Sequence, residues 1–185
     1  MSYFKQTIDG DIGTLEFDTP DSSVNILSSA ALTELEQQLD EIAGRSDIKV
    51  LLITSAKKSI FIAGADIKEI ESITDPQEAS EKCNRGKQVF DKLEKLPQIT
   101  VAVINGACLG GGYELSLACT YRVAGFAGCV KIGLPEVRLG ILPGFGGCVR
   151  LPKLIGIGNA LSVILPGKVL DANRALTLGM VDRLF

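Results

Sequence analysis

The chain has 185 residues, of which 46% are hydrophobic and 22% charged, with a formal net charge of −3 at pH 7. This composition is typical of a folded globular protein, and the small negative charge gives no basic footprint for nucleic acid or an anionic membrane. The absence of histidine excludes Ser-His-Asp and Cys-His catalysis and leaves carboxylates as the leading candidates for acid–base chemistry.

Targeting and cysteine patterns point to a reducing compartment. No apolar run is long enough for a transmembrane helix, and the start, MSYFKQTIDG, lacks the apolar core of a signal peptide. We therefore expect a cytoplasmic protein without a membrane span. The five cysteines are scattered and contain no CxxC pair, which indicates neither a zinc site nor a disulfide framework. We expect them to be reduced and mostly buried, with no bound metal.

The first half of the chain predicts two strands, a helix, a strand and a second helix. Residues 7–20 read as two short strands around an Asp-Gly turn. Residues 28–44 have apolar side chains at helical spacing between a serine and a glycine, and so predict a helix. The apolar run over 48–55 is typical of a strand covered on both faces. A long amphipathic helix follows over 75–96 and ends before a proline.

The second half continues the alternation. Residues 99–105 predict a buried strand, residues 113–120 a short helix, and residues 121–125 and 129–133 a pair of strands. Beyond these, three segments have helical apolar spacing, namely 148–156, 158–165 and 172–179. The last residues read as a strand or its entry.

The order strand, strand, helix recurs, and no linker or shift in composition divides it. The economical interpretation is a single α/β domain over residues 1–185. The chain ends at Phe185 inside an apolar stretch. We therefore expect that it is cut from something longer.

Three consecutive glycines, Gly110 to Gly112, stand at the start of a helical pattern in NGACLGGGYELSLAC. Backbone amides in the first helical turn have no intrahelical acceptor, and the helix dipole adds partial positive charge, so such a turn can face a developing negative charge. Alternatively, the glycines only allow close packing of a strand against a helix. The stretch alone leaves both readings open. It matches neither GxGxxG nor a Walker loop.

Acidic residues lie in or beside three apolar segments. Glu114, in the first turn of the predicted helix, lies either at the helix edge or buried for chemistry. Glu136 lies in GLPEVRLGILPGFGG, where prolines and glycines fix a specific path. In FIAGADIKEI, the small residues 63–65 leave room for backbone contact with a ligand, and Asp66 alone could be only an N-cap.

Taken together and in order, FIAGADIKEI, NGACLGGGYELSLAC and GLPEVRLGILPGFGG resemble the signature segments of the crotonase (enoyl-CoA hydratase/isomerase) superfamily. Within it, the chain is most similar to the N-terminal hydratase/isomerase part of the multifunctional fatty-oxidation alpha subunit. The resemblance implies an α/β crotonase-like spiral of repeated β-β-α units. It also implies that the C-terminal helical segment of the family, which helps close the acyl site, is missing here.

The resemblance implies roles for particular residues. The backbone amides of Ala65 and Gly111 would form an oxyanion hole for the thioester carbonyl. Glu114 and Glu136 would be the catalytic pair, with Glu136 as acid/base at the α carbon and Glu114 activating water. The backbone of Gly144 would lie near that water.

Further positions would contact the coenzyme A part of the substrate. The resemblance places Ala63, Asp66, Ile67 and Lys68 along this contact. Lys68 would pair with a phosphate, although a lysine at a helix start is more often only solvated. Because coenzyme A belongs to the substrate, no separate cofactor is implied.

The activity implied is hydration of trans-2-enoyl-CoA to 3-hydroxyacyl-CoA in fatty acid β-oxidation. Two alternatives stay open: Δ3,Δ2-enoyl-CoA isomerisation, and a non-catalytic acyl-CoA-binding or assembly module. The partners implied are an acyl-CoA thioester and either copies of the chain in a trimer-like homo-oligomer or the other parts of a fatty-oxidation complex.

Overall fold

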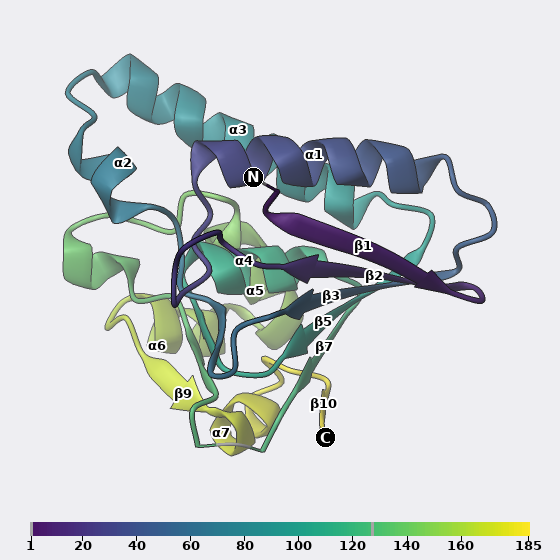
Figure 1. Cartoon of the computed structure of the whole chain (residues 1–185). Coiled ribbons are helices and arrows are strands. Elements are labelled where there is room, and N and C mark those ends of the chain that lie inside the picture. The colour runs from purple at the N-terminus through teal and green to yellow at the C-terminus, as the bar shows by residue number, and fades with distance from the viewer. Residues whose placement is uncertain (1, 127) are drawn as a thin grey trace.

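Two β-sheets organise the computed structural model, which describes residues 2–126 and 128–185 (Figure 1). The larger sheet has six strands in the spatial order β1 (Phe4–Asp9), β2 (Ile12–Phe17), β3 (Val50–Ser55), β5 (Ile99–Ile104), β7 (Tyr121–Ala124) and β10 (Arg183–Leu184). The smaller sheet has the order β4 (Ile60–Ile62), β6 (Ala107–Leu109), β8 (Lys131–Gly133) and β9 (Val169–Asp171). Only the pairs β1–β2 and β8–β9 among these described strands are antiparallel.

The chain repeats one unit, which confirms the predicted β-β-α spiral. In each of three successive units, the first strand (β3, β5 or β7) joins the larger sheet, and the second (β4, β6 or β8) joins the smaller one. Helix α1 (Ser29–Ala43) follows β2. The other helical segments follow the second strands or close the chain, and these are α2 (Ile67–Glu71), α3 (Pro76–Glu94), α4 (Gly111–Ala118), η1 (Glu136–Leu139), α5 (Gly147–Ile155), α6 (Ile157–Ile164) and α7 (Ala172–Thr177).

The two long helices form where the sequence predicts them. Ser28 caps α1 by accepting a hydrogen bond from the Ala31 N–H, and Asp75 caps α3 by accepting one from Gln77. The apolar stripe of α1 is buried, and α1 and α3 lie side by side over the larger sheet (Figure 1). No helix in the described part of the chain is both long enough and apolar enough to cross a membrane.

Three predictions about local structure need correction. The strands expected as a pair, β7 and β8, belong to different sheets, because each is the first or second strand of the repeated unit. Helix α4 starts at Gly111 rather than Tyr113, because the Gly110 carbonyl accepts from the N–H groups of Tyr113 and Glu114. The cysteines are free thiols, but only Cys108 and Cys119 are buried, so "mostly buried" was wrong.

Gly112 brings the N-terminus of α4 against β4. A Cβ at this position would overlap the carbonyl oxygen of Ile62, the last residue of β4. No side chain stands between them that could move aside. This glycine therefore sets the distance between two elements whose ends border the cavity described below.

We expect Gly112→Ala to lower the free energy of unfolding by about 1–3 kcal/mol, because β4 and α4 must separate to admit the methyl group. Gly158→Ala is the matched control: it also lies in a helix, and a Cβ there meets no atom within 4 Å. The control should stabilise by up to about 1 kcal/mol through helix propensity. Urea denaturation of both variants measures this, and equal stability would show that the close approach is not needed.

Candidate active site

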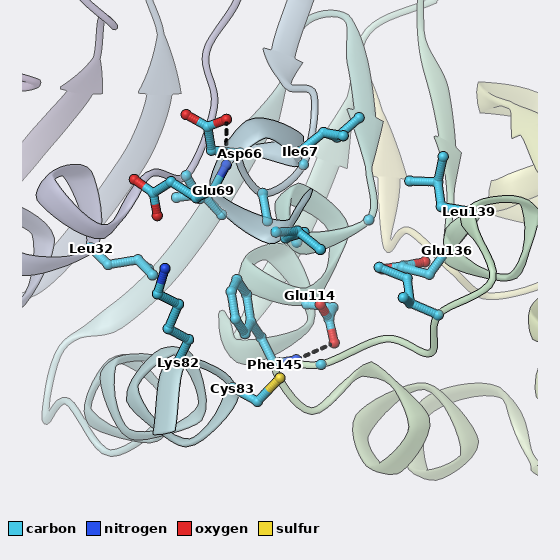
Figure 2. Close-up of a pocket in the computed structure, with 18 of the residues that line it drawn as sticks. Leu32, Asp66, Ile67, Glu69, Lys82, Cys83, Glu114, Glu136, Leu139 and Phe145 are labelled. Carbon is cyan, nitrogen blue, oxygen red and sulfur yellow. Dashed lines mark hydrogen bonds between the residues drawn. The ribbon is translucent and has the colours of Figure 1, made fainter. Parts of the chain in front are cut away.

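The three sequence segments singled out above meet at one cavity of about 290 Å³. They follow β4, β6 and β8, which are neighbouring parallel strands, so their C-terminal ends share one edge of the smaller sheet. The cavity is lined by eight of the nine predicted site residues, which are Ala63, Ala65, Asp66, Ile67, Gly111, Glu114, Glu136 and Gly144 (Figure 2). The ninth, Lys68, is exposed and does not line it.

The peptide group between Gly64 and Ala65 has a fixed orientation. The Gly64 carbonyl accepts a hydrogen bond from the Leu27 N–H at 2.9 Å. In a planar trans peptide the N–H points opposite to the carbonyl, so the Ala65 N–H points away from Leu27. Within residues 2–126 and 128–185, that N–H has no acceptor.

The peptide group between Gly110 and Gly111 is held in the same manner. Its carbonyl accepts from Tyr113 at 2.8 Å and from Glu114 at 2.9 Å, which directs the oxygen into α4. The Gly111 N–H therefore points outward from the helix N-terminus, where the helix dipole is positive. It too lacks an acceptor among the described residues.

Glycine is required immediately before each of these two amides. Gly64 has φ +118° and Gly110 has φ +53°, in the region that disfavours side chains. A Cβ on Gly110 would lie 3.8 Å from the Gly64 Cα and 3.2 Å from the Glu136 carboxylate. The two loops are thus neighbours, and the residues Ala65 and Gly111 line the same cavity.

Glu114 is buried, with 1% of its surface exposed, which decides between the two sequence readings. Its Oε1 accepts hydrogen bonds from the backbone N–H groups of Phe145 at 2.8 Å (Figure 2) and of Gly147 at 2.7 Å. Burial raises its pKa to about 7. The two N–H groups oppose this rise, and the charge of Glu136 adds to it.

Glu136 is the first residue of η1 and is 8% exposed. Both of its carboxyl oxygens are buried, and neither has a hydrogen-bond partner among the described residues. Burial raises its pKa above the usual range. A buried carboxyl without a partner can bond to a molecule that enters the cavity.

The cavity walls beyond Glu114 and Glu136 are mostly apolar, although the charged residues Asp66, Glu69, Lys82 and Arg85 also line the cavity. They are formed mainly by Leu27, Leu32, Ile67, Ile70, Ile73, Leu139, Ile141, Leu142 and Phe145. Asp66 is the N-cap of α2, which is the simpler of the roles that the sequence offered, because its side chain accepts hydrogen bonds from the N–H groups of Lys68 and Glu69. Over the described residues, no three acidic, cysteine or histidine side chains are grouped so as to hold a metal ion.

Some groups at the site were missed by sequence reasoning. The N–H donors to Glu114 come from positions 31 and 33 residues further along the chain, and no local pattern reports such a pairing. The only available signal was the glycine-rich end of the third segment. The role of Leu27 as donor to Gly64 was likewise invisible, since it depends on the backbone alone.

The fold is the crotonase fold, since it superposes on solved enoyl-CoA hydratases over the whole chain. The structure titled an enoyl-CoA hydratase from Geobacillus kaustophilus matches with a TM-score of 0.95 and 34% identity, over 69% of that chain. The enoyl-CoA hydratase of Bacillus anthracis matches with a TM-score of 0.92 and 34% identity, over 70% of its chain. The Enoyl-CoA hydratase/isomerase family pattern matches residues 7–185, and the chain belongs to that family.

Among curated proteins, the chain is similar to fatty acid oxidation complex alpha subunits. That of Aliivibrio fischeri is 47% identical over 94% of this chain, and that of Vibrio cholerae is 46% identical over 91%. The chain spans about a quarter of the length of these relatives (26% and 24%).

We expect stability to fall as pH rises from about 4.5 through about 7. Glu114 has a pKa of about 7 in the folded protein and the usual 4.5 in the unfolded chain, so folding binds a proton in this window and is weakened when the proton is lost. Glu114→Gln removes this dependence. Its stability relative to the unmodified chain should therefore increase by about 3 kcal/mol between pH 4 and pH 8. Urea denaturation across this range tests it, and a difference independent of pH would contradict it.

Proposed function

We propose that this chain adds water to the double bond of a trans-2-enoyl-CoA and forms 3-hydroxyacyl-CoA. The observation that supports the proposal is that Ala65 and Gly111, whose N–H groups have no acceptor among the described residues, line one mostly apolar cavity together with two buried carboxyls. Residues 1–185 would be one hydratase/isomerase core domain.

The two amides would bind the thioester oxygen. Attack of water on the β carbon places enolate charge on that oxygen, and fixed donors stabilise charge that develops in the transition state by several kcal/mol. The orientations of the N–H groups of Ala65 and Gly111, set by bonds to the preceding carbonyls, support this role. Donors held in place in advance need no reorganisation during the reaction.

The carboxyls would exchange the protons. Glu114 is held through Oε1, which leaves Oε2 to take a proton from water, with the backbone of Gly144 beside it. Glu136, whose oxygens have no hydrogen-bond partner among the described residues, would give a proton to the α carbon. Burial raises the pKa of both groups, and the charge of Glu136 adds to the rise for Glu114.

The remaining parts of the substrate fit the surroundings. The apolar walls suit an acyl chain, and Ala63, Asp66 and Ile67 would border coenzyme A at the mouth. A contact between exposed Lys68 and a phosphate stays part of the proposal. By analogy with relatives named as subunits of a fatty acid oxidation complex, the reaction would serve fatty acid oxidation, and the chain would assemble with its own copies or within such a complex.

Isomerisation of Δ3-enoyl-CoA to Δ2-enoyl-CoA is a second candidate. One observation favours it as an additional activity: within the described part of the chain, neither carboxyl oxygen of Glu136 has a hydrogen-bond partner. A single such carboxyl can take a proton from the α carbon and return it two carbons further along, with the same stabilised enolate between the two steps.

We expect the purified chain to remove the conjugated-thioester absorbance of crotonyl-CoA, and Glu114→Gln and Glu136→Gln each to lower kcat by about 100-fold or more, since each loses a proton-transfer group. Glu41→Gln is the matched control, because Glu41 is exposed on α1. Its kcat should equal that of the unmodified chain.

Full turnover by Glu136→Gln would contradict the assignment of that residue. Binding of crotonyl-CoA without turnover by the unmodified chain would instead favour the non-catalytic module. A Δ3-enoyl-CoA converted by the unmodified chain but not by Glu136→Gln would support the second activity.

A further inference from the structure

Arg150 lies behind the catalytic pair, outside the cavity lining, and is 8% exposed. It belongs to α5, and its guanidinium makes three hydrogen bonds. Nη1 donates to the Phe145 carbonyl at 3.0 Å, Nη2 to Asp91 at 2.5 Å and Nε to Glu94 at 2.9 Å. Both carboxylates belong to α3, so one side chain ties α3 to the loop before α5.

That loop is the one that holds Glu114. The Phe145 carbonyl belongs to the peptide group between residues 145 and 146. This group lies between the two N–H groups, of Phe145 and Gly147, that donate to Glu114 Oε1. Because successive peptide groups share a Cα, fixing the middle one restricts the directions of the two on either side.

The sequence leaves room for the guanidinium at a specific position. Gly146 has φ +109°, and a Cβ there would overlap Nη1 of Arg150. A second glycine, Gly86 of α3, admits the ring of Phe145, which also packs edge-on against Phe90 at 5.6 Å between centroids. The backbone and ring of Phe145 are therefore both anchored to α3.

We propose that Arg150 is a positioning residue for the hydration reaction. By bonding to both α3 and the Phe145 carbonyl, it fixes the loop whose N–H groups hold Glu114, and so keeps that carboxyl directed at the water. The inference rests on the proposed function for its effect on turnover. Arginine suits this role because a planar fork can bond two carboxylates and a carbonyl at once, whereas lysine cannot.

The charge of Arg150 acts in the same direction as its geometry. It favours the ionised form of Glu114, as do the two N–H groups that it helps to place. Other charged or titratable groups face Glu114: Glu136 on η1, which opposes ionisation, and the Cys148 thiol on α5, whose own pKa is raised by burial and then by the two glutamates. The Cys83 thiol of α3 borders the same cavity.

The test compares Arg150→Met and Arg150→Lys with Arg174→Met, whose side chain is exposed in a pair with Asp171. With crotonyl-CoA, we expect Arg150→Met to lower kcat about 10- to 100-fold with little change in KM, because the water-activating carboxyl is misplaced. The acidic limb of the pH profile should move up by about one unit. Arg150→Lys should keep the limb near its original pH but recover only part of kcat, and Arg174→Met should change neither.

A second variant covers the case in which loss of Arg150 prevents folding. Asp91 and Glu94 are half-exposed, so Asp91→Asn with Glu94→Gln removes the anchors while leaving Arg150 in place. We expect this double variant to lose kcat several-fold at unchanged KM. Full kcat in a folded double variant, together with an unmoved acidic limb in any folded Arg150→Met, would overturn the proposal.

A readout without turnover separates this inference from the proposed function. The Glu114 carboxyl is followed by NMR in protein labelled with ¹³C at glutamate carboxyls, with Glu114→Gln to assign its signal. Its pKa should rise in Arg150→Met, because a neighbouring positive charge is lost, and stay unchanged in Arg174→Met. An unmodified chain that does not hydrate crotonyl-CoA but shows this rise refutes the proposed function alone. Turnover by the unmodified chain with no rise refutes the role of Arg150.

Discussion

The carbonyl oxygens of Gly64 and Gly110 each accept hydrogen bonds from the protein, and these bonds decide what the opposite edge of the same peptide group can do. Leu27 holds the first, and the first turn of α4 holds the second. The N–H groups of Ala65 and Gly111 have no acceptor in the described part of the chain, and the proposal assigns them to a ligand. Rotation of either peptide group would turn a carbonyl toward the position where negative charge develops, so the proposed chemistry depends on these bonds more than on any side chain.

The three consecutive glycines show how one short stretch meets several demands. Gly110 adopts a positive φ that ends β6 and starts α4, Gly111 presents its amide, and Gly112 lets α4 contact the backbone of β4. The two sequence readings, a site for negative charge and a close packing of strand and helix, are thus compatible. Glu114 follows on the first turn of this helix and is buried.

The three segments were predicted from their glycines and apolar surroundings, and the pairing of both glutamates from the family resemblance. They meet because β4, β6 and β8 are neighbouring parallel strands that end at the same edge of one sheet. Contacts made by backbone groups far apart in the chain could not be predicted. The donors to Glu114 come from a loop more than thirty positions away, and nothing in the apolar pattern places β7 and β8 in different sheets. Asp66 is the N-cap of α2, an interpretation that the sequence already offered, whereas the exposure of Lys68 follows from its place on the outer side of that short helix.

Infrared difference spectroscopy of bound butyryl-CoA, labelled with ¹³C at the thioester carbonyl, tests the two-amide arrangement most directly. This thioester is saturated and cannot be hydrated, so the band reports the carbonyl in the bound state alone. Two donors on one oxygen polarise the carbonyl. We therefore expect its stretching band to lie at lower frequency in the complex than in solution. If the protein is fully occupied by butyryl-CoA and the band still lies at the solution frequency, the amides of Ala65 and Gly111 do not bind this oxygen. That result would contradict the central claim.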